Sequence, residues 1–437
     1  MRWFISTTCI PNIKSQAQPC GYGHKLLNKQ YIKEVIKIEE LTGLYLVKVE
    51  AGANNNKFYR MIKNGDIFEV QFGRIGNSGY QTTSYPMSRW ESTLKSKIKK
   101  GYADQTRLVA DETITQKSRE YIDIQSIHIK SIVEKLQSMA RKAISDNYTI
   151  SSNKVSQKMV DEAQLLVNEL INTRDLENFN ITLVELFKTI PRKMGKVADY
   201  LASSTESFAN IIQREQDLLD VMLGQVIQNI VEEVVDDIAQ PTQTILDAMG
   251  LVFEEVSQQD IDTIKHNLGS ISDKFHQAWK VTNTRTQDKF NGFIDEHNIT
   301  NKKMLWHGSR NENWWSIINT GLILRPSAVI SGKMFGYGIY FSPKAQKSLG
   351  YTSLSGSYWA GGSSNSAFMS LYDVAYGIPY DAHSFENRYS NLTYETLQGL
   401  CKGANCLHAH AGNMLRNDEI IVYKEEQLTI KYLVELR

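Results

Sequence analysis

The sequence predicts an α+β chain of several domains: a small β-sheet with one helix, an all-helical region, and a mainly β domain at the C-terminal end. Three changes in residue composition and in the spacing of apolar residues along the chain indicate this. Short β-branched and aromatic runs fill residues 44–85, apolar residues at helical spacing fill 121–285, and Gly, Ser, Tyr and Trp become frequent beyond residue 300. The 437 residues, of which 41% are hydrophobic, are enough to bury several cores.

The small sheet is indicated by three strand-like runs, LYLVKVE, KFYRMI and DIFEVQFGRI. Two clusters of turn-forming residues, Gly-Ala-Asn-Asn-Asn and Lys-Asn-Gly-Asp, separate these runs, as in an antiparallel sheet. After Pro86 the spacing changes, and Trp90, Leu94 and Ile98 fall on one face of a helix. We expect this helix to close on the sheet.

The middle of the chain has apolar residues three and four positions apart over long segments, such as MVDEAQLLVNELI and LLDVMLGQVIQNIVEEVV. This spacing is typical of amphipathic helices that bury one face. Turn residues and prolines punctuate the segments. The pattern divides the chain into an N-terminal extension (1–40), a strand-rich domain (41–118), a helical region (121–285) and a C-terminal domain (286–437).

The charge is distributed unevenly, although the net charge of the whole chain is only +1. Residues 1–130 contain 20 basic and 12 acidic residues, whereas residues 131–300 contain 16 basic and 26 acidic residues. An acidic surface repels the phosphates of nucleic acids, and a basic surface attracts them. Direct contact with nucleic acid is therefore expected in the first segment and not in the helical region.

The composition also limits the compartment. The four cysteines, at positions 9, 20, 401 and 406, are too few and too scattered for a disulfide framework, which favours a reducing compartment. No apolar run reaches the roughly 18 residues that a membrane span needs, so we expect a soluble chain without a membrane partner. With the reducing compartment, this favours an intracellular protein.

Three features of the C-terminal domain carry groups suited to chemistry. His307 follows an apolar strand, Tyr340 and Tyr351 flank Lys347-Ser348, and Glu419 opens the run EIIVY. Each has an ordinary structural interpretation: a hydrogen-bonding histidine, a core tyrosine or a solvated glutamate. Their order and surroundings are what favour function.

The segments WHGSR, MFGYGIYFS, KSLGY and DEIIVY, followed by TIKYL, occur in the order found in the catalytic domain of the poly(ADP-ribose) polymerases. The resemblance covers about residues 300–437. It implies that the family's His-Tyr-Glu triad is carried by His307, Tyr340 and Glu419, and that Tyr351 is the tyrosine that stacks on the nicotinamide ring.

The resemblance further implies that NAD⁺ is consumed as a substrate, so that no cofactor is expected. Nicotinamide leaves the ribose as positive charge develops on the sugar, and hydrogen bonds to the ribose hydroxyls strengthen in that transition state. Glu419 would bond the 2′-hydroxyl and position an acceptor, and His307 would donate to the adenosine ribose. The expected NAD⁺-binding residues are His307, Gly308, Ser309, Tyr340, Lys347, Ser348 and Tyr351, with the backbone of Gly308 and the hydroxyl of Ser348 on the carboxamide.

Two upstream segments resemble other parts of the same family. The run Phe72-Gly73-Arg74-Ile75-Gly76 resembles the signature of the WGR domain, with Phe72 in place of the signature tryptophan. The segments QLLVNELI and ELFKTIPRKMG resemble the helical regulatory subdomain, which would restrict access of NAD⁺ until DNA docks. The expected DNA-binding residues are Arg74, Arg89, Lys95 and Lys99; the alternative is that the basic helix is a solvated face.

Four metal-ligand residue types, Cys401, Cys406, His408 and His410, lie within ten residues. Their spacing matches neither a zinc finger nor a zinc ribbon, and the resemblance gives this stretch a loop without metal. We therefore expect no metal site.

The leading hypothesis is a DNA-activated poly(ADP-ribose) polymerase that modifies itself and other proteins in a DNA-damage response. Its partners would be NAD⁺, DNA ends or breaks, and protein acceptors. The alternatives are a mono-ADP-ribosyltransferase or NAD⁺ glycohydrolase, and, from another class, a catalytically silent sensor of NAD⁺ or ADP-ribose. The family suggests a nuclear location in a host with a nucleus and a cytoplasmic one otherwise.

Overall fold

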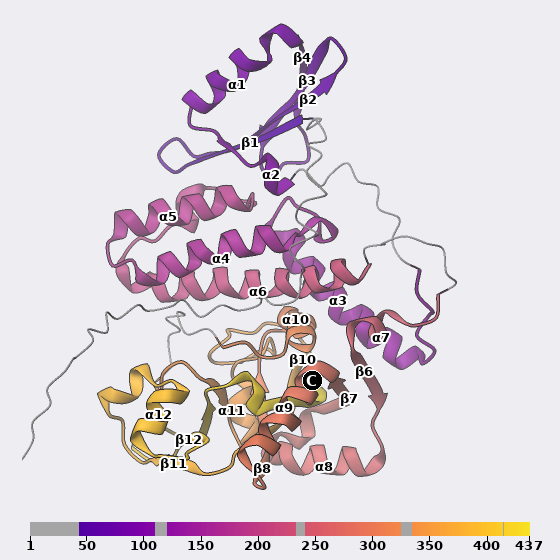
Figure 1. The fold of residues 1–437 in the computed structure, drawn as a ribbon, viewed down its shortest axis with the longest axis vertical. Helices are drawn as coiled ribbons and strands as arrows, with labels where there is room; N and C mark the ends of the chain where they lie inside the picture. The colour runs from indigo at the N-terminus through magenta and orange to yellow at the C-terminus, as the bar shows by residue number, and fades with distance from the viewer. Residues whose placement is uncertain (1–42, 110–119, 233–240, 325–333, 414) are drawn as a thin grey trace, which may run out of the picture. The chain divides into compact units, whose positions relative to one another are not determined.

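The computed structural model describes residues 43–109, 120–232, 241–324, 334–413 and 415–437. Its mixture of helices and mainly antiparallel sheets confirms the α+β prediction (Figure 1). Within these ranges, no helix combines the length and the apolar character that a membrane crossing requires. The predicted N-terminal extension lies outside the described residues.

The strand-rich domain is a five-stranded sheet in the order β4-β3-β2-β1-β5 with a helix packed on it. Its elements are β1 (Gly43–Glu50), β2 (Asn55–Asn64), β3 (Ile67–Arg74), β4 (Gln81–Pro86), α1 (Trp90–Lys99), β5 (Ala103–Asp104) and α2 (Thr106–Val109). As the spacing predicts, Trp90 and Leu94 of α1 pack on the apolar core of the sheet, whereas Ile98, expected on the same face, is 46% exposed. The edge strand β4 was not predicted, because its residues, QTTSYP, are mostly exposed and polar.

The helical region follows. Its helices are α3 (Ile127–Asn147), α4 (Gln157–Asn172), α5 (Leu176–Thr189), α6 (Phe208–Glu232) and α7 (Ile245–Met249). Figure 1 shows α4, α5 and α6 side by side, and α4 contacts both of the others. Ser126, Ser156 and Asp175 accept hydrogen bonds from the first turns of α3, α4 and α5, which defines where these helices begin.

The C-terminal region contains two sheets. The first has the order β6-β7-β14-β10-β8, and the second has the order β11-β12-β13-β9, in which only β11 and β12 run parallel. The strands are β6 (Leu251–Glu255), β7 (Phe275–Asn283), β8 (Lys302–Gly308), β9 (Ile339–Phe341), β10 (Ala367–Ala375), β11 (Pro379–Ala382), β12 (Cys406–Ala409), β13 (Glu419–Val422) and β14 (Leu428–Leu436).

Helices join and cover these strands. They are α8 (Gln258–Leu268), α9 (Thr284–His297), α10 (Trp314–Thr320), α11 (Ala345–Leu349) and α12 (Tyr394–Leu400). Short 3-10 helices lie at Met87–Arg89, Ser152–Lys154, Val197–Tyr200, Thr205–Ser207, Gly269–Lys274, Asn311–Asn313, Asn387–Asn391 and Glu425–Gln427.

The all-helical pattern was expected to continue to residue 285, but β6 and β7 lie within this range. They pair with each other, and β7 pairs with β14 in the first C-terminal sheet. The run FHQAWKVTN of β7 alternates only in part between buried and exposed positions, and it follows helix α8. The two-residue period of a strand was therefore not recognised in the sequence.

Helix α6 lies unusually close to α10. A Cβ atom built on Gly224 of α6 would lie 2.5 Å from the Cα atom of Ser316 in α10. The hydroxyl of Ser316 donates to the carbonyl of Asp220, and the indole of Trp315 donates to the side chain of Gln228 at 3.0 Å. Only glycine at position 224 permits this approach.

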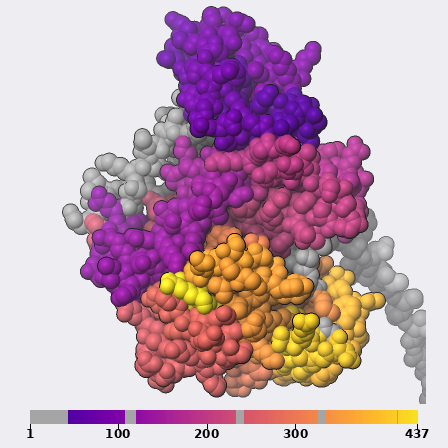
Figure 2. Space-filling model, turned by 180° about the vertical axis from the view of Figure 1, so that it is seen from behind, coloured from indigo at the N-terminus to yellow at the C-terminus, as the bar shows by residue number. Residues whose placement is uncertain are grey.

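A second contact links α3 to the last strand. The Lys135 ammonium lies 2.9 Å from the carboxylate of Glu435 in β14, whose side chain is 4% exposed. In the space-filling view the C-terminal residues, in yellow, lie beside helical residues drawn in purple (Figure 2). The helical region therefore contacts the first C-terminal sheet through charge as well as through packing.

The helical region is held by a buried ion pair between Arg192 and Glu215, whose side chains are each 2% exposed. Arg192 also donates to the side chain of Asn147 at 3.1 Å, and Arg214 donates to Glu215 at 3.0 Å. Removing one partner of such a pair leaves the other charge buried and uncompensated.

We expect Arg192→Met to lower the free energy of unfolding by about 3–5 kcal/mol, because Glu215 would lose its buried partner. Urea denaturation followed by circular dichroism measures this. The double variant Arg192→Met/Glu215→Leu should regain most of the loss, since it buries no lone charge. A single variant as stable as wild type would contradict the importance of the pair.

Burial raises the pKa of the Asp217 carboxyl in α6 to about 7, although the amide of Gln213 donates to it at 2.6 Å. The folded protein therefore binds a proton between pH 4 and 7 that the unfolded chain releases. Protonation of Asp217 therefore stabilises the folded state. This stabilisation is complete below the unfolded pKa of 3.8 and is lost as the pH rises through about 7.

We expect Asp217→Asn, which cannot ionise, to lose less stability than wild type between pH 5 and pH 8. Denaturation midpoints at the two pH values measure the difference. The exposed Asp161→Asn in α4 is the matched control and should follow wild type. Parallel pH profiles for wild type and Asp217→Asn would contradict the raised pKa.

Candidate active site

His307 lies near the end of β8, where its neighbour Trp306 forms a bridge to Ser342. The Nδ1 atom of His307 is 3.1 Å from the backbone carbonyl oxygen of Tyr340. Burial lowers the pKa of His307 to about 4, so the ring is neutral near pH 7. Because a carbonyl can only accept, Nδ1 carries the proton and Nε2 presents a lone pair.

Tyr340 lies at the centre of the short strand β9, opposite Ile421 of β13. Its hydroxyl accepts from the backbone N–H of Phe335 at 3.0 Å and donates to the carbonyl of Gly336 at 3.1 Å. Burial raises the pKa of Tyr340 well above its ordinary value. The hydroxyl therefore stays protonated and holds the turn that precedes β9.

Glu419 is the first residue of β13 and is 7% exposed. Its carboxylate forms an ion pair with the ammonium of Lys347, which projects from α11 and is itself largely buried. Glu419 also raises the pKa values of Tyr340 and Tyr351, after burial as the main cause, which indicates that both phenols lie near this carboxylate. The structure thus brings these four predicted residues together.

Gly308 and Ser348 approach each other closely. A Cβ atom on Gly308 would lie 2.0 Å from the backbone oxygen of Ser348, so no other residue fits there. The hydroxyl of Ser348 donates to the carbonyl of Trp306 at 3.1 Å, which leaves its oxygen able to accept. Ser309 accepts a hydrogen bond at 3.1 Å from the side chain of Asn313.

Tyr351 is the most exposed of these predicted residues, at 42%. Its ring stacks on that of Trp359, with the centroids 6.1 Å apart and the planes 15° from parallel. Trp359 is 64% exposed, and its neighbour Tyr358 is 81% exposed. Sequence reasoning missed Trp359; the available signal was a pair of adjacent aromatics within a segment rich in glycine and serine.

The four predicted DNA-binding residues differ in their surroundings. Lys95 and Lys99 are exposed on α1, and the exposed Arg89 guanidinium lies 4.9 Å from the centre of the Tyr85 ring. Arg74, in contrast, donates to the backbone oxygens of Asn54, at 2.8 Å, and of residues 194 and 195. Its guanidinium links the strand-rich domain to the helical region and is not free.

Phe72, which stands at the position of the signature tryptophan, belongs to the sheet itself. It lies in β3 opposite Tyr59, and the two rings are tilted with centroids 5.9 Å apart. Phe72 is partly buried against the apolar core of this sheet. The aromatic side chain therefore contributes to the domain's own packing.

Comparison with known proteins identifies the family of two parts of the chain. Residues 253–437 match the model of the poly(ADP-ribose) polymerase catalytic domain, and residues 42–108 match that of the WGR domain. A poly [ADP-ribose] polymerase-like protein, 100L, of Invertebrate iridescent virus 6 is 34% identical over 188 residues, which are 42% of this chain and 97% of the viral protein.

Two further relatives differ in length. The uncharacterized protein 101L of the same virus is 30% identical over 181 residues, covering 40% of this chain and 75% of its own. The poly [ADP-ribose] polymerase of Drosophila melanogaster is 26% identical over 373 residues, covering 77% of this chain and 36% of its own. Given these matches and the grouping of Glu419 with Lys347 and Tyr340, this chain belongs to the poly(ADP-ribose) polymerase family and is an NAD⁺ ADP-ribosyltransferase.

Proposed function

We propose that this enzyme builds poly(ADP-ribose) on itself and on other proteins, and that DNA ends or breaks activate it in a DNA-damage response. The observation that carries the proposal is the buried pair of Glu419 and Lys347 beside Tyr340 and Tyr351. A buried carboxylate held by one ammonium is a preorganised partner for the positive charge that develops on the ribose. NAD⁺ serves as the consumed substrate, and no cofactor is needed.

In this proposal Glu419 accepts a hydrogen bond from the 2′-hydroxyl of the nicotinamide ribose and orients the acceptor hydroxyl. Lys347 holds the carboxylate in place through the ion pair. Tyr340 closes the turn that carries the site, and Tyr351, stacked with Trp359, offers an exposed ring face to nicotinamide. In this proposal the aromatic surface at the nicotinamide therefore includes Trp359 as well as the predicted Tyr351.

The role of His307 differs from the expected one. Since its Nδ1–H is committed to the Tyr340 carbonyl and the ring is neutral, Nε2 accepts a hydrogen bond from a ribose hydroxyl and does not donate one. The backbone of Gly308 and the hydroxyl of Ser348 bind the carboxamide, and Ser309 supports this loop through Asn313.

DNA binding in the proposal relies on the exposed cations of the strand-rich domain. Arg89, Lys95 and Lys99 are exposed, and in this proposal they contact phosphates without reading sequence. Arg74 is assigned instead to the link with residues 194 and 195. A DNA-dependent enzyme acts where DNA is, in the nucleus of a host that has one.

The main test is an incubation with labelled NAD⁺, with and without nicked or blunt-ended DNA, resolved on a denaturing gel. Wild type should give a DNA-stimulated ladder. Glu419→Gln removes the negative charge and should reduce elongation by about 10²–10³-fold, leaving at most a single band. Glu296→Gln, exposed on α9, is the matched control and should behave as wild type.

The other outcomes identify the alternatives. A single band with wild type would make the enzyme a mono-ADP-ribosyltransferase, and free ADP-ribose alone would make it a glycohydrolase. An equal ladder without DNA would refute activation by DNA. Binding of NAD⁺ without any turnover would indicate a sensor.

Regulation by the helical region is tested at Gly224. We propose that the close contact of α6 with α10 restrains the enzyme, so Gly224→Ala should push the helices apart and raise activity in the absence of DNA several-fold. A helical Gly→Ala change without a clash should leave activity unchanged; Gly292→Ala in α9, where nothing lies within 4 Å, is that control. Unchanged activity in a folded Gly224→Ala protein would contradict the restraint.

A further inference from the structure

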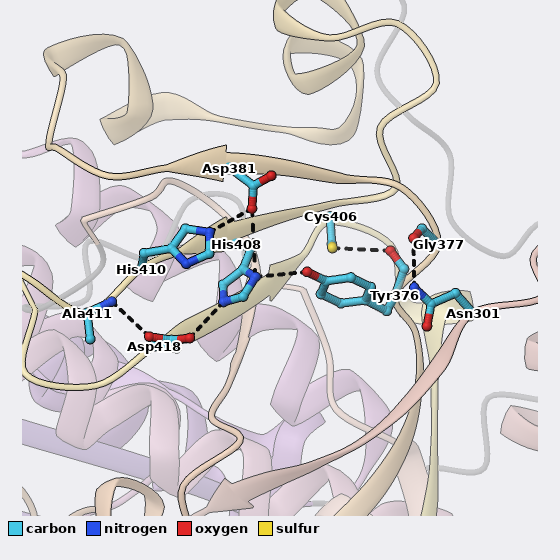
Figure 3. A network of polar contacts seen from close by, with 9 residues as sticks. All are labelled: Asn301, Tyr376, Gly377, Asp381, Cys406, His408, His410, Ala411 and Asp418. Carbon is cyan, nitrogen blue, oxygen red and sulfur yellow. Dashed lines mark hydrogen bonds and ion pairs between the residues drawn. The ribbon is translucent and has the colours of Figure 1, made fainter.

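A cluster of metal-ligating side chains lies on the second C-terminal sheet, apart from the pair of Glu419 and Lys347. It consists of Asp381, His408 and His410, each of which offers one ligand atom within 4.8 Å of the others (Figure 3). Asp381 of β11 lies directly opposite His408 of β12 in the parallel pairing. His410 directly follows the end of β12, two residues after His408, and its Nε2 atom joins them.

The distances suit a small cation. The Nε2 atom of His410 is 2.7 Å from the Oδ1 atom of Asp381, and the Nδ1 atom of His408 is 3.8 Å from the same oxygen. In a tetrahedral zinc site with bonds of about 2.0–2.2 Å, neighbouring ligand atoms are about 3.4 Å apart. The two measured distances lie on either side of this value, and all three ligand atoms lie within 4.8 Å of one another.

The tautomer of His408 is already the one that a metal needs. Its Nε2 atom is 3.0 Å from the Oδ2 atom of Asp418, and an ionised carboxylate can only accept, so Nε2 carries the proton. The Nδ1 lone pair then faces the cluster, where the Tyr376 hydroxyl donates to it at 2.8 Å. A histidine that gives its second N–H to a carboxylate is the usual arrangement around protein-bound metals.

Asp418 is itself held in place, because its other carboxylate oxygen accepts from the backbone N–H of Ala411 at 2.8 Å. The two carboxylates, of Asp381 and Asp418, provide negative charge on both sides of the imidazoles. The side chains of Asp381 and His410 are 49% and 28% exposed, so an ion has a path to the cluster. The ring of His383 stacks on that of His410, with the centroids 4.3 Å apart.

We propose that Asp381, His408 and His410 bind a divalent transition-metal ion, with Zn²⁺ as the natural occupant. Two imidazoles and one carboxylate suit zinc and its neighbours, whereas Mg²⁺ and Ca²⁺ prefer ligand sets made of oxygen. Cys406, considered earlier for a zinc site, is not part of this one. Its thiol donates to the backbone carbonyl of Tyr376 at 3.2 Å.

The ion would act on structure and not on the substrate. Glu419 lies opposite Ala409, so its side chain points away from the face that carries His408 and His410. Asp418, however, immediately precedes Glu419 and is bonded to His408. A bound metal would thus link β11 and β12, through His408, to Asp418, which directly precedes Glu419 at the start of β13.

The test uses the full chain without an added histidine tag, freed of metal by a chelator. Equilibrium dialysis against Zn²⁺ should show about one ion per chain, and Co²⁺ should give the visible d–d absorption of a nitrogen- and oxygen-bound site. Zn²⁺ should also raise the unfolding temperature. The double variant His408→Asn/His410→Asn should lose the ion, and Asp418→Asn should weaken binding about 10–100-fold.

His276→Asn is the matched control for nonspecific binding, because His276 is exposed and lies in β7 of the other sheet. It should bind Zn²⁺ as wild type does. If the double variant fails to fold, the single variant His410→Asn, at the more exposed of the two histidines, gives the same comparison. Equal Co²⁺ spectra for wild type and either variant would overturn the proposal, and so would a wild type that binds no Zn²⁺ at micromolar concentration.

Discussion

The site depends on the register of one short strand, β13, whose four residues are all buried. It pairs with β12 on one side and with β9 on the other, and this places Glu419 at the end of the strand and Ile421 opposite Tyr340. In a sheet, a shift by one residue turns every side chain to the opposite face. Such a shift would remove Glu419 from Lys347 and bring Asp418 into its place.

The buried pair of Glu419 and Lys347 is not explained by stability. Taking both charges out of water is unfavourable, and an apolar pair of similar size is often as stable or more so. What the pair provides is a carboxylate of fixed position in surroundings where its field is weakly screened. At His307, in contrast, burial favours the neutral form of the ring, and the Tyr340 carbonyl fixes its tautomer.

Much of this could be predicted from the sequence, because it rests on local pattern. Periodicity located the first three strands, α1 and the main helices, and short motifs in family order located Glu419, Lys347 and Tyr340. The grouping of these residues is observed in the structure, while their individual roles stay predictions. The polar edge strand β4 and the strands β6 and β7 gave no clear local signal.

What the sequence could not reveal depends on chain segments that meet only in the fold. Besides Asn54, the partners of Arg74 lie 120 and 121 residues away, so the sequence did not indicate that this basic residue is engaged within the fold. In the same way, the parallel pairing of β11 with β12 brings Asp381 beside His408, although a 3-10 helix and helix α12 lie between them in the sequence. Asp381 lies outside the segment 401–410 that contains the two histidines, so the spacing of ligand residues in the sequence did not indicate it.

The stacked rings of Tyr351 and Trp359 also give the enzyme a built-in optical reporter. Among the tryptophans in the described part of the chain, Trp359 alone is largely exposed, whereas Trp279, Trp306, Trp314 and Trp315 are at most 3% exposed. Emission from water-exposed indole is red-shifted relative to that from buried indole. Red-shifted emission from Trp359 therefore reports on the surroundings of this stacked pair, without any label attached to the protein.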